Sequence, residues 1–318
     1  MNTPVPWRLV LMAAVVVVAG ASGAVGGQAG IEGPVAGAAA CPVFPEDNAW
    51  NTPVDTLPVA ENSDAIIRSI GADTGLHPDF GSGKYDGAPI GIPYTVVPGD
   101  QPKKRVRFLY ADESDKGPYP IPRRVKIEGG PESDGDRHAL LIDKDNCKLY
   151  ELYRLFRRPD GRWKAGSGAI WDLRSNRLRP EGWTSADAAG LPILPGLARF
   201  EDVAAGEIDH ALRFTVSQSR SAYIWPARHF ASDDDSANLP PMGLRVRLRA
   251  DFPVGDYPPQ AQVILRALQV YGMMVADNGS DWFISGAPNP GWDNDDLHSL
   301  GDVLGSDFEV VDTSSMKP

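Results

Sequence analysis

Acidic and aromatic residues gather in residues 273–296, MMVADNGSDWFISGAPNPGWDNDD, which hold five aspartates and two tryptophans. Asp277 and Asp281 flank an Asn-Gly pair there, and Trp282 follows at once. A flat indole stacks on a sugar ring while carboxylates accept hydrogen bonds from its hydroxyls, so this combination suits a glycan site. A structural interpretation stays open, because Asn-Gly favours a type I′ hairpin turn that the two aspartates would only flank.

Glu151 is the strongest candidate for acid–base chemistry. In the alternating pattern CKLYELYRL it falls on the apolar face of a strand, where burial raises the pKa of a carboxyl group as a general acid requires. A hairpin would bring His138 close to it across the strands. Asp172, which ends the strand AIWDL beside Trp171, would be the second carboxylate. Structural roles remain open for both, namely a hydrogen-bonded buried Glu151 and an Asx turn at Asp172.

The stretch IWPARHFAS favours a second chemistry, that of a polysaccharide lyase. Arg228 would neutralise the carboxylate of a uronate, and His229 would abstract the proton at the adjacent carbon, with His138 as an alternative base. Tyr223, Tyr150 or Tyr153 could assist the reaction, and Tyr150 and Tyr153 could also bind substrate. The candidates for stacking on sugar rings share an indole next to a polar residue or a strand end: Trp171, Trp225 and Trp282. A third possibility is a non-catalytic glycan- or cell-wall-binding protein.

Calcium is the one cofactor that the sequence suggests, through the alternate oxygens of Asp293 and Asp295. The stretch lacks the glycine and distal glutamate of a calcium loop, and Asp295 could instead cap a short helix at LHSLGDV. The sequence contains no nucleophile elbow, phosphate-binding glycine loop or zinc-peptidase motif. No other cofactor is therefore expected.

Short strand patterns dominate the elements that must position these residues. Alternating or apolar segments bounded by turn residues predict strands at RVRFLYAD, HALLID, CKLYELYRLF, GRWKAGSGAIWDL, HALRFTVS, AYIWPA, GLRVRLRADF, MMVAD, DWFISG and FEVVDT. Residues 60–71 predict a helix with Asn62 or Ser63 as its cap and Gly71 as its end. Residues 258–272, PPQAQVILRALQVYG, predict one long packed helix. We therefore expect a mainly β fold, a single-domain β-sandwich of jelly-roll type or a barrel, with α+β as the alternative.

The N-terminal residues predict export. Residues 1–24 read as a signal peptide, residues 25–40 as a flexible Gly- and Ala-rich lead-in, and residues 41–318 as one β-rich domain. In an exported chain the only two cysteines, Cys41 and Cys147, are expected to form a disulfide bond. Lipidation of Cys41 is disfavoured, because the leucine expected three residues earlier is missing. The sequence thus predicts a secreted protein that leaves the membrane once the signal is cleaved.

Charge is distributed unevenly along the chain, whose net charge is −11. Residues 101–180 hold 19 Lys and Arg against 12 Asp and Glu, whereas the rest of the chain is strongly acidic. The basic third could face an anionic partner or could be solvated strand edges. Nucleic acid is not an expected partner, because no recognition motif occurs and most of the chain is acidic.

Several blocks carry a family resemblance: LHPDFGSG, GWTSADAAGLPILPGLAR, GEIDHALRFT, WPARHFAS, PPMGLRVRL and ADNGSDWFISGAP. Through them nearly the whole mature region resembles a family of exported bacterial proteins of the actinobacterial type. The resemblance implies one extracellular domain and carries over no activity or catalytic residue. The residues themselves favour a secreted glycoside hydrolase that uses Glu151 and Asp172, with Asp277 and Asp281 in reserve. Its partner would be a polysaccharide or cell-wall glycan.

Overall fold

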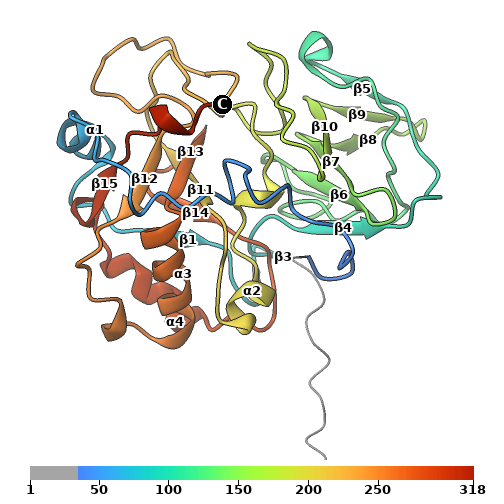
Figure 1. The fold of residues 1–318 in the computed structure, drawn as a ribbon. Helices are drawn as coiled ribbons and strands as arrows, with labels where there is room; N and C mark the ends of the chain where they lie inside the picture. The colour runs from blue at the N-terminus through green and yellow to red at the C-terminus, as the bar shows by residue number, and fades with distance from the viewer. Residues whose placement is uncertain (1–34) are drawn as a thin grey trace, which may run out of the picture. The chain divides into compact units, whose positions relative to one another are not determined.

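The computed structural model describes residues 35–318. The predicted signal peptide and most of the lead-in fall in residues 1–34 and lie outside the described residues. Residues 35–40 form tight turns, and Val35 and Ala38 pack in the main hydrophobic core. The described part of the chain is rich in sheet and has few helices, which confirms the prediction of a mainly β or α+β fold (Figure 1).

The largest sheet has six strands in the order β1-β14-β11-β13-β12-β15. Their bounds are β1 (His77–Asp79), β14 (Phe283–Ser285), β11 (Leu212–Val216), β13 (Met273–Asn278), β12 (Arg245–Leu248) and β15 (Phe308–Val310). β1 pairs with β14 and β11 pairs with β13 in parallel, while the other pairs are antiparallel. The sheet is therefore mixed, a feature that the strand patterns alone did not predict.

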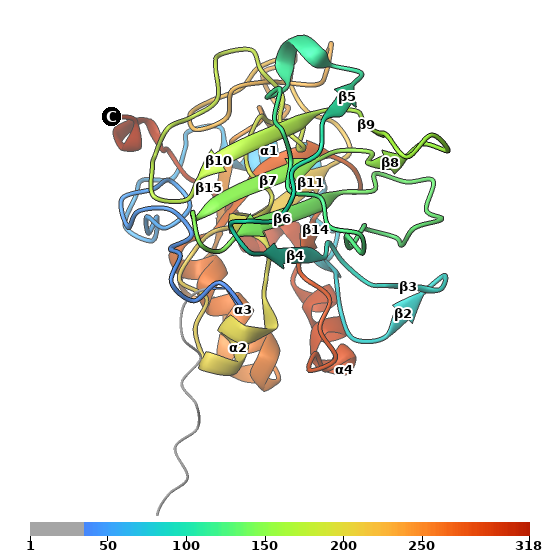
Figure 2. The same ribbon diagram turned by 90° about the vertical axis from the view of Figure 1, so that its right-hand side faces the viewer.

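A four-stranded sheet has the order β10-β7-β6-β4 (Figure 2). Its strands are β10 (Gly168–Asp172), β7 (Lys148–Leu152), β6 (Ala139–Asp143) and β4 (Tyr94–Val97). Side chains alternate between its two faces, so Leu149 joins the main core while Leu152 joins a second core. The second core lies against a three-stranded sheet of β5 (Val106–Phe108), β9 (Trp163–Ala165) and β8 (Phe156–Arg157). β2 (Lys84–Tyr85) and β3 (Ala88–Pro89) form a separate two-stranded ribbon.

Four α-helices accompany the sheets in the described residues, α1 (Ser63–Ile70), α2 (Phe200–Ala205), α3 (Pro259–Val270) and α4 (Asn294–His298). Short 3-10 turns complete the structure: Ala111–Glu113, Leu194–Gly196, Val254–Asp256, Ser299–Asp302, Gly305–Asp307 and Ser314–Met316. Both helices expected from the sequence are confirmed. α1 follows Asn62 and ends at Gly71, whose φ of 117° suits glycine, and α3 packs on β12.

Three local predictions are wrong. The Asn278-Gly279 pair forms no hairpin, because β11 lies between β13 and β14 and neither residue has a positive φ. The cap of α4 is Asp293 rather than Asp295, since its carboxylate accepts the backbone N–H of Asp295 and Asp296. The strand expected at residues 222–227 is reduced to an isolated bridge at Tyr223. In the first case the pairing of both strands with the distant β11 decides the conformation, which local preference alone cannot.

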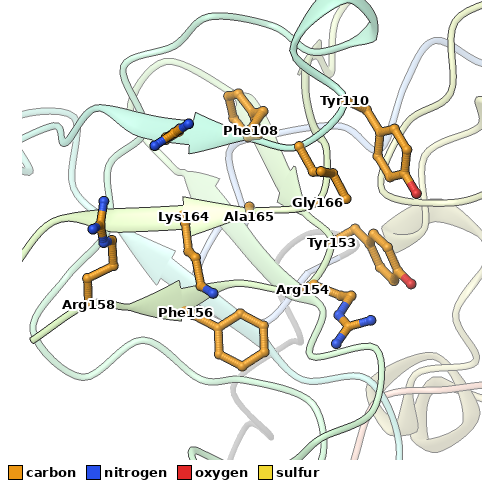
Figure 3. A pocket seen from close by; sticks show the side chains of 11 residues that line it. Phe108, Tyr110, Tyr153, Arg154, Phe156, Arg158, Lys164, Ala165 and Gly166 are labelled. Carbon is orange, nitrogen blue, oxygen red and sulfur yellow. The ribbon is translucent and has the colours of Figure 1, made fainter.

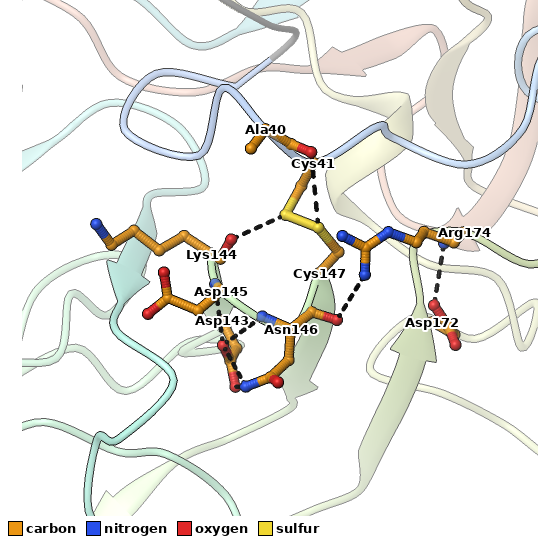
Figure 4. The surroundings of a disulfide bond; sticks show 9 residues. All are labelled: Ala40, Cys41, Asp143, Lys144, Asp145, Asn146, Cys147, Asp172 and Arg174. Atoms are coloured by element: carbon orange, nitrogen blue, oxygen red, sulfur yellow. Dashed lines mark hydrogen bonds between the residues drawn. A yellow bond between two sulfur atoms is a disulfide. The ribbon is translucent and has the colours of Figure 1, made fainter.

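The predicted disulfide between Cys41 and Cys147 is confirmed (Figure 4). The two Cα atoms lie 5.2 Å apart across a sequence separation of 106 residues. Cys147 closes the predicted β6–β7 hairpin, in whose turn the Asp143 carboxylate accepts the N–H of Asn146. Because the bond occupies the sulfur of Cys41, that sulfur cannot also carry a lipid. Among residues 35–318, no helix combines the length and apolar character needed to cross a bilayer.

Candidate active site

Glu151 is fully buried in the centre of the four-stranded sheet. Its carboxyl oxygens accept the backbone N–H groups of Ile193 and Leu194 at 2.9–3.0 Å. Burial raises the pKa of Glu151 to about 7, although the two backbone hydrogen bonds oppose the shift. With no exposed surface, this carboxyl group anchors the segment around Leu194 and cannot reach a substrate.

The other predicted carboxylates are held by local partners. Asp172 ends β10, and its oxygen lies 2.6 Å from Nζ of Lys148, whose hydrogen bond lowers the pKa of Asp172. The Asp281 carboxylate accepts the backbone N–H of Ser217 at 2.6 Å and its hydroxyl at 2.8 Å. Neither residue lies beside Glu151 in a carboxylate pair, so the pairing that the sequence favours does not form.

The predicted aromatic and histidine contacts are divided among separate environments. Trp282 has no exposed surface, stacks on Phe214 and Phe308, and therefore cannot contact a glycan. Trp171 and Trp225 line a small cavity of about 160 Å³, whose described lining residues include none of the predicted carboxylates. Tyr150 and His138 are buried as well: Tyr150 accepts a hydrogen bond from Lys103, and His138 lies 2.6 Å from Glu128.

A cavity of about 400 Å³, which we call the acid pocket, brings three predicted site residues together. These are Asp277, His229 and Tyr153, and three further acids join them in the lining: Glu113, Asp136 and Asp187. The contributing segments are far apart in sequence, so the pocket exists only in the folded chain. Arg228 is not part of this lining; its guanidinium lies 3.6 Å from Glu181.

The carboxyl end of β13 places Asp277 at this pocket. The β11–β13 register shifts there, from Phe214 opposite Val275 to Thr215 opposite Asp277, so Ala276 is left out of the pairing. Such a bulge re-aims the side chain that follows it. The carbonyl of Ala276 is satisfied by the N–H of Ala189, which ties the bulge to the loop that carries Asp187.

The loop of residues 183–191 holds Asp187 at the inner wall of the pocket. Gly190 has a φ of 69°, and a Cβ there would lie 2.5 Å from the carbonyl oxygen of Trp183, so only glycine fits. The Asp187 carboxylate receives two hydrogen bonds from the buried Arg213, at 2.8 and 3.0 Å. This bidentate contact fixes both its position and its orientation.

Asp277 has the most strongly perturbed carboxyl group of the pocket. Burial is the main reason that its pKa rises to about 8, and the charge of Asp187 together with a hydrogen bond to it adds to the effect. Two adjacent carboxyl groups share a proton in this way because they cannot both ionise cheaply. Asp277 therefore remains a protonated acid at neutral pH, next to solvent rather than sealed inside.

Glu113 and His229 form the opposite side of the pocket. Oε2 of Glu113 accepts the N–H of Thr184 at 3.1 Å and lies 3.9 Å from Nε2 of His229. Nδ1 of His229 lies 2.8 Å from the carbonyl oxygen of Ala188, which can only accept, so Nδ1 carries the hydrogen. In the neutral ring Nε2 is then free to accept a proton.

Sequence reasoning missed Asp187, Glu113 and Asp136 as members of a site. One signal for Asp187 was present: Arg213 interrupts the apolar strand ALRFTV, and a carboxylate is a common partner of a buried arginine. In residues 35–318 no group of three or more His, Cys, Asp or Glu side chains is arranged to hold a metal ion. Asp293 serves as a helix cap, so we do not propose calcium near Asp293 and Asp295.

Comparisons with protein-family models, with curated proteins and with solved structures found no match to this chain. The comparisons therefore assign no family, and the residues of the acid pocket carry the functional argument alone.

Proposed function

We propose that the chain is an exported glycoside hydrolase that cleaves a polysaccharide in the acid pocket. The observation that carries the proposal is a protonated carboxylic acid, Asp277, in one solvent-accessible cavity with the carboxylate of Glu113. Glycosidic bond cleavage requires this combination of a proton donor and a second carboxyl group. Export is supported by the Cys41–Cys147 disulfide, because such bonds persist in oxidising compartments.

Each residue has a defined part in the proposed reaction. Asp277 donates its proton to the glycosidic oxygen as the bond from that oxygen to the anomeric carbon breaks. Glu113 takes a proton from the attacking water, whose oxygen bonds to the anomeric carbon. The N–H of Thr184 orients Glu113, while burial and the charge of Asp187 keep Asp277 protonated.

A lyase is the second candidate, and the free Nε2 of His229 in the same pocket favours it. Tyr153 also lines the pocket, but burial and the charge of Asp136 raise its pKa, so its phenol suits proton donation rather than abstraction. Arg228, expected to neutralise a uronate, does not line the pocket. We therefore favour hydrolysis, which uses the raised pKa of Asp277 directly.

The test compares turnover of a polysaccharide panel by the wild type and by Asp277→Asn. Loss of a general acid is expected to lower kcat by roughly 10²- to 10⁴-fold. Asp172→Asn is the matched control, and its kcat should stay at the wild-type value because Asp172 pairs with Lys148 instead. Ultraviolet absorbance from an unsaturated product would establish a lyase. Retention of a glycan without any cleavage would establish a binding protein.

A further inference from the structure

A second cavity opens beside the acid pocket on the face of the three-stranded sheet (Figure 3). It has a volume of about 620 Å³, and we call it the cationic groove after Arg107, Arg154, Arg158 and Lys164. The described residues that line it include no aspartate or glutamate. The groove therefore presents positive charge without internal compensation.

The positions of these cations favour a ligand over a simple solvated edge. Arg107 of β5 and Lys164 of β9 are direct partners in the parallel pairing, and like charges directly opposite one another destabilise a sheet. Lys164 also lies on the central strand of this sheet, where protection against edge-to-edge pairing is not needed. Of the four cations, Arg158 alone forms an ion pair among the described residues, with Asp160 at 3.7 Å.

Aromatic side chains lie beside the cations in the lining of the groove. The exposed fraction of Tyr110 is 47 % and that of its neighbour Leu109 is 75 %, and both lie in the groove lining. Nζ of Lys164 lies 5.1 Å from the centre of the Phe156 ring. Rings next to cations match a polymer of sugar rings that carry negative groups better than they match a small inorganic anion.

The groove and the acid pocket adjoin each other, because Tyr110 and Tyr153 line both cavities. A chain that extends from the groove past these two tyrosines would enter the acid pocket, which Asp277 lines. We propose that the cationic groove binds an anionic polysaccharide, whose carboxylate or sulfate groups contact Arg107, Arg158 and Lys164. This substrate class rests on the proposed cleavage in the acid pocket, whereas binding in the groove does not require it.

The test measures binding of three polymers by the full chain, namely polygalacturonate, dextran sulfate and neutral dextran. Arg107→Gln with Lys164→Gln removes two charges and should weaken binding of the anionic polymer about tenfold or more. The same variant should unfold at no lower a urea concentration than the wild type, because it also removes the repulsion across the strands. Lys84→Glu on the separate β2–β3 ribbon is the control and should bind normally.

Binding of either anionic polymer with little binding of dextran supports the proposal, and the better of the two identifies carboxylate or sulfate as the recognised group. Equal binding of dextran, an unchanged affinity in the double variant, or tighter binding of a single-stranded oligonucleotide would overturn it. A different result would contradict the proposed function, namely that Asp277→Asn still cleaves the polymer that the groove binds.

Discussion

Replacing Asp277 by asparagine should make the protein less sensitive to alkali as well as inactive. The folded protein keeps a proton on Asp277 up to a pKa of about 8, whereas the unfolded chain loses it near the ordinary aspartate pKa of 3.8. Between these values the folded state binds one more proton, so the free energy of unfolding falls as pH rises. The stability that the Asp277 proton contributes is fully present below pH 3.8 and is lost progressively as the pH rises toward about 8.

The size of this loss in the free energy of unfolding is set by the one extra proton that the folded state binds. Each pH unit in this window removes at most about 1.4 kcal/mol, so the wild type loses at most about 2.7 kcal/mol between about pH 5 and about pH 7. Asp277 is half-buried, and solvent screening reduces the effect to about 1–2 kcal/mol. The asparagine variant has no such loss, since its amide can still accept the N–H of Asn278 and donate to Asp187.

Urea unfolding of both proteins across this pH range measures the effect as a difference. Glu151 and His138, whose pKa values are raised to about 7 and about 9, titrate in both proteins and largely cancel in that difference. The stability of the variant relative to the wild type should therefore increase with pH. If the free energies of unfolding of the two proteins instead changed equally with pH, Asp277 would be ionised in the folded protein. The argument that it is a proton donor would then be refuted.

Three further changes test the structural roles assigned above. Glu151→Ala should lower the free energy of unfolding by about 2–4 kcal/mol, because it leaves a cavity and two buried N–H groups unpaired, while kcat of the folded enzyme stays unchanged. Reduction of the Cys41–Cys147 bond should cost about 2–4 kcal/mol, seen as a lower Tm, without loss of turnover at moderate temperature. Trp282→Phe should cost about 2 kcal/mol in urea unfolding through lost packing and the lost bond to Gly71, and glycan pull-down should be unaffected.

Local signals in the sequence were sufficient for the elements whose partners are near in the chain. The turn KDN joins β6 to β7 as predicted, and the prolines and apolar spacing of residues 258–272 place α3 correctly. The alternating pattern also placed Glu151 on the face of β7 that packs in the main core. These features depend on strand and helix periodicity, which a single sequence carries.

The acid pocket depends on contacts that periodicity does not record. Asp187 lies in an irregular loop, and its importance comes from Arg213, 26 residues away. The bulge at Ala276, which changes the direction of the Asp277 side chain, lies in the parallel pairing of β11 with β13. The Asn-Gly pair instead predicted a hairpin between consecutive strands. The sequence correctly predicts that burial raises the pKa of Glu151, as a general acid requires. The structure buries the carboxyl group completely, however, so it cannot contact a substrate.

The balance of buried charges explains why Asp277 is the residue that keeps its proton. Glu128 is paired with His138, and Asp187 is paired with Arg213, so each of these acids has its own cation. Among the described residues Asp277 forms no ion pair of its own, and it adjoins the charge of Asp187. Neutralising it with a proton costs less than burying a second negative charge beside Asp187.

Asp187→Asn should therefore move the activity toward acid. The substitution removes the repelling charge and leaves the cation of Arg213 close to Asp277, so the pKa of Asp277 should fall from about 8. The upper limb of the kcat/KM profile should shift to lower pH by a unit or more, with Asp281→Asn as a control of unchanged profile. An unshifted limb in a variant that folds normally would show that Asp187 does not set the protonation of Asp277, and the proposed acid would lose its physical basis.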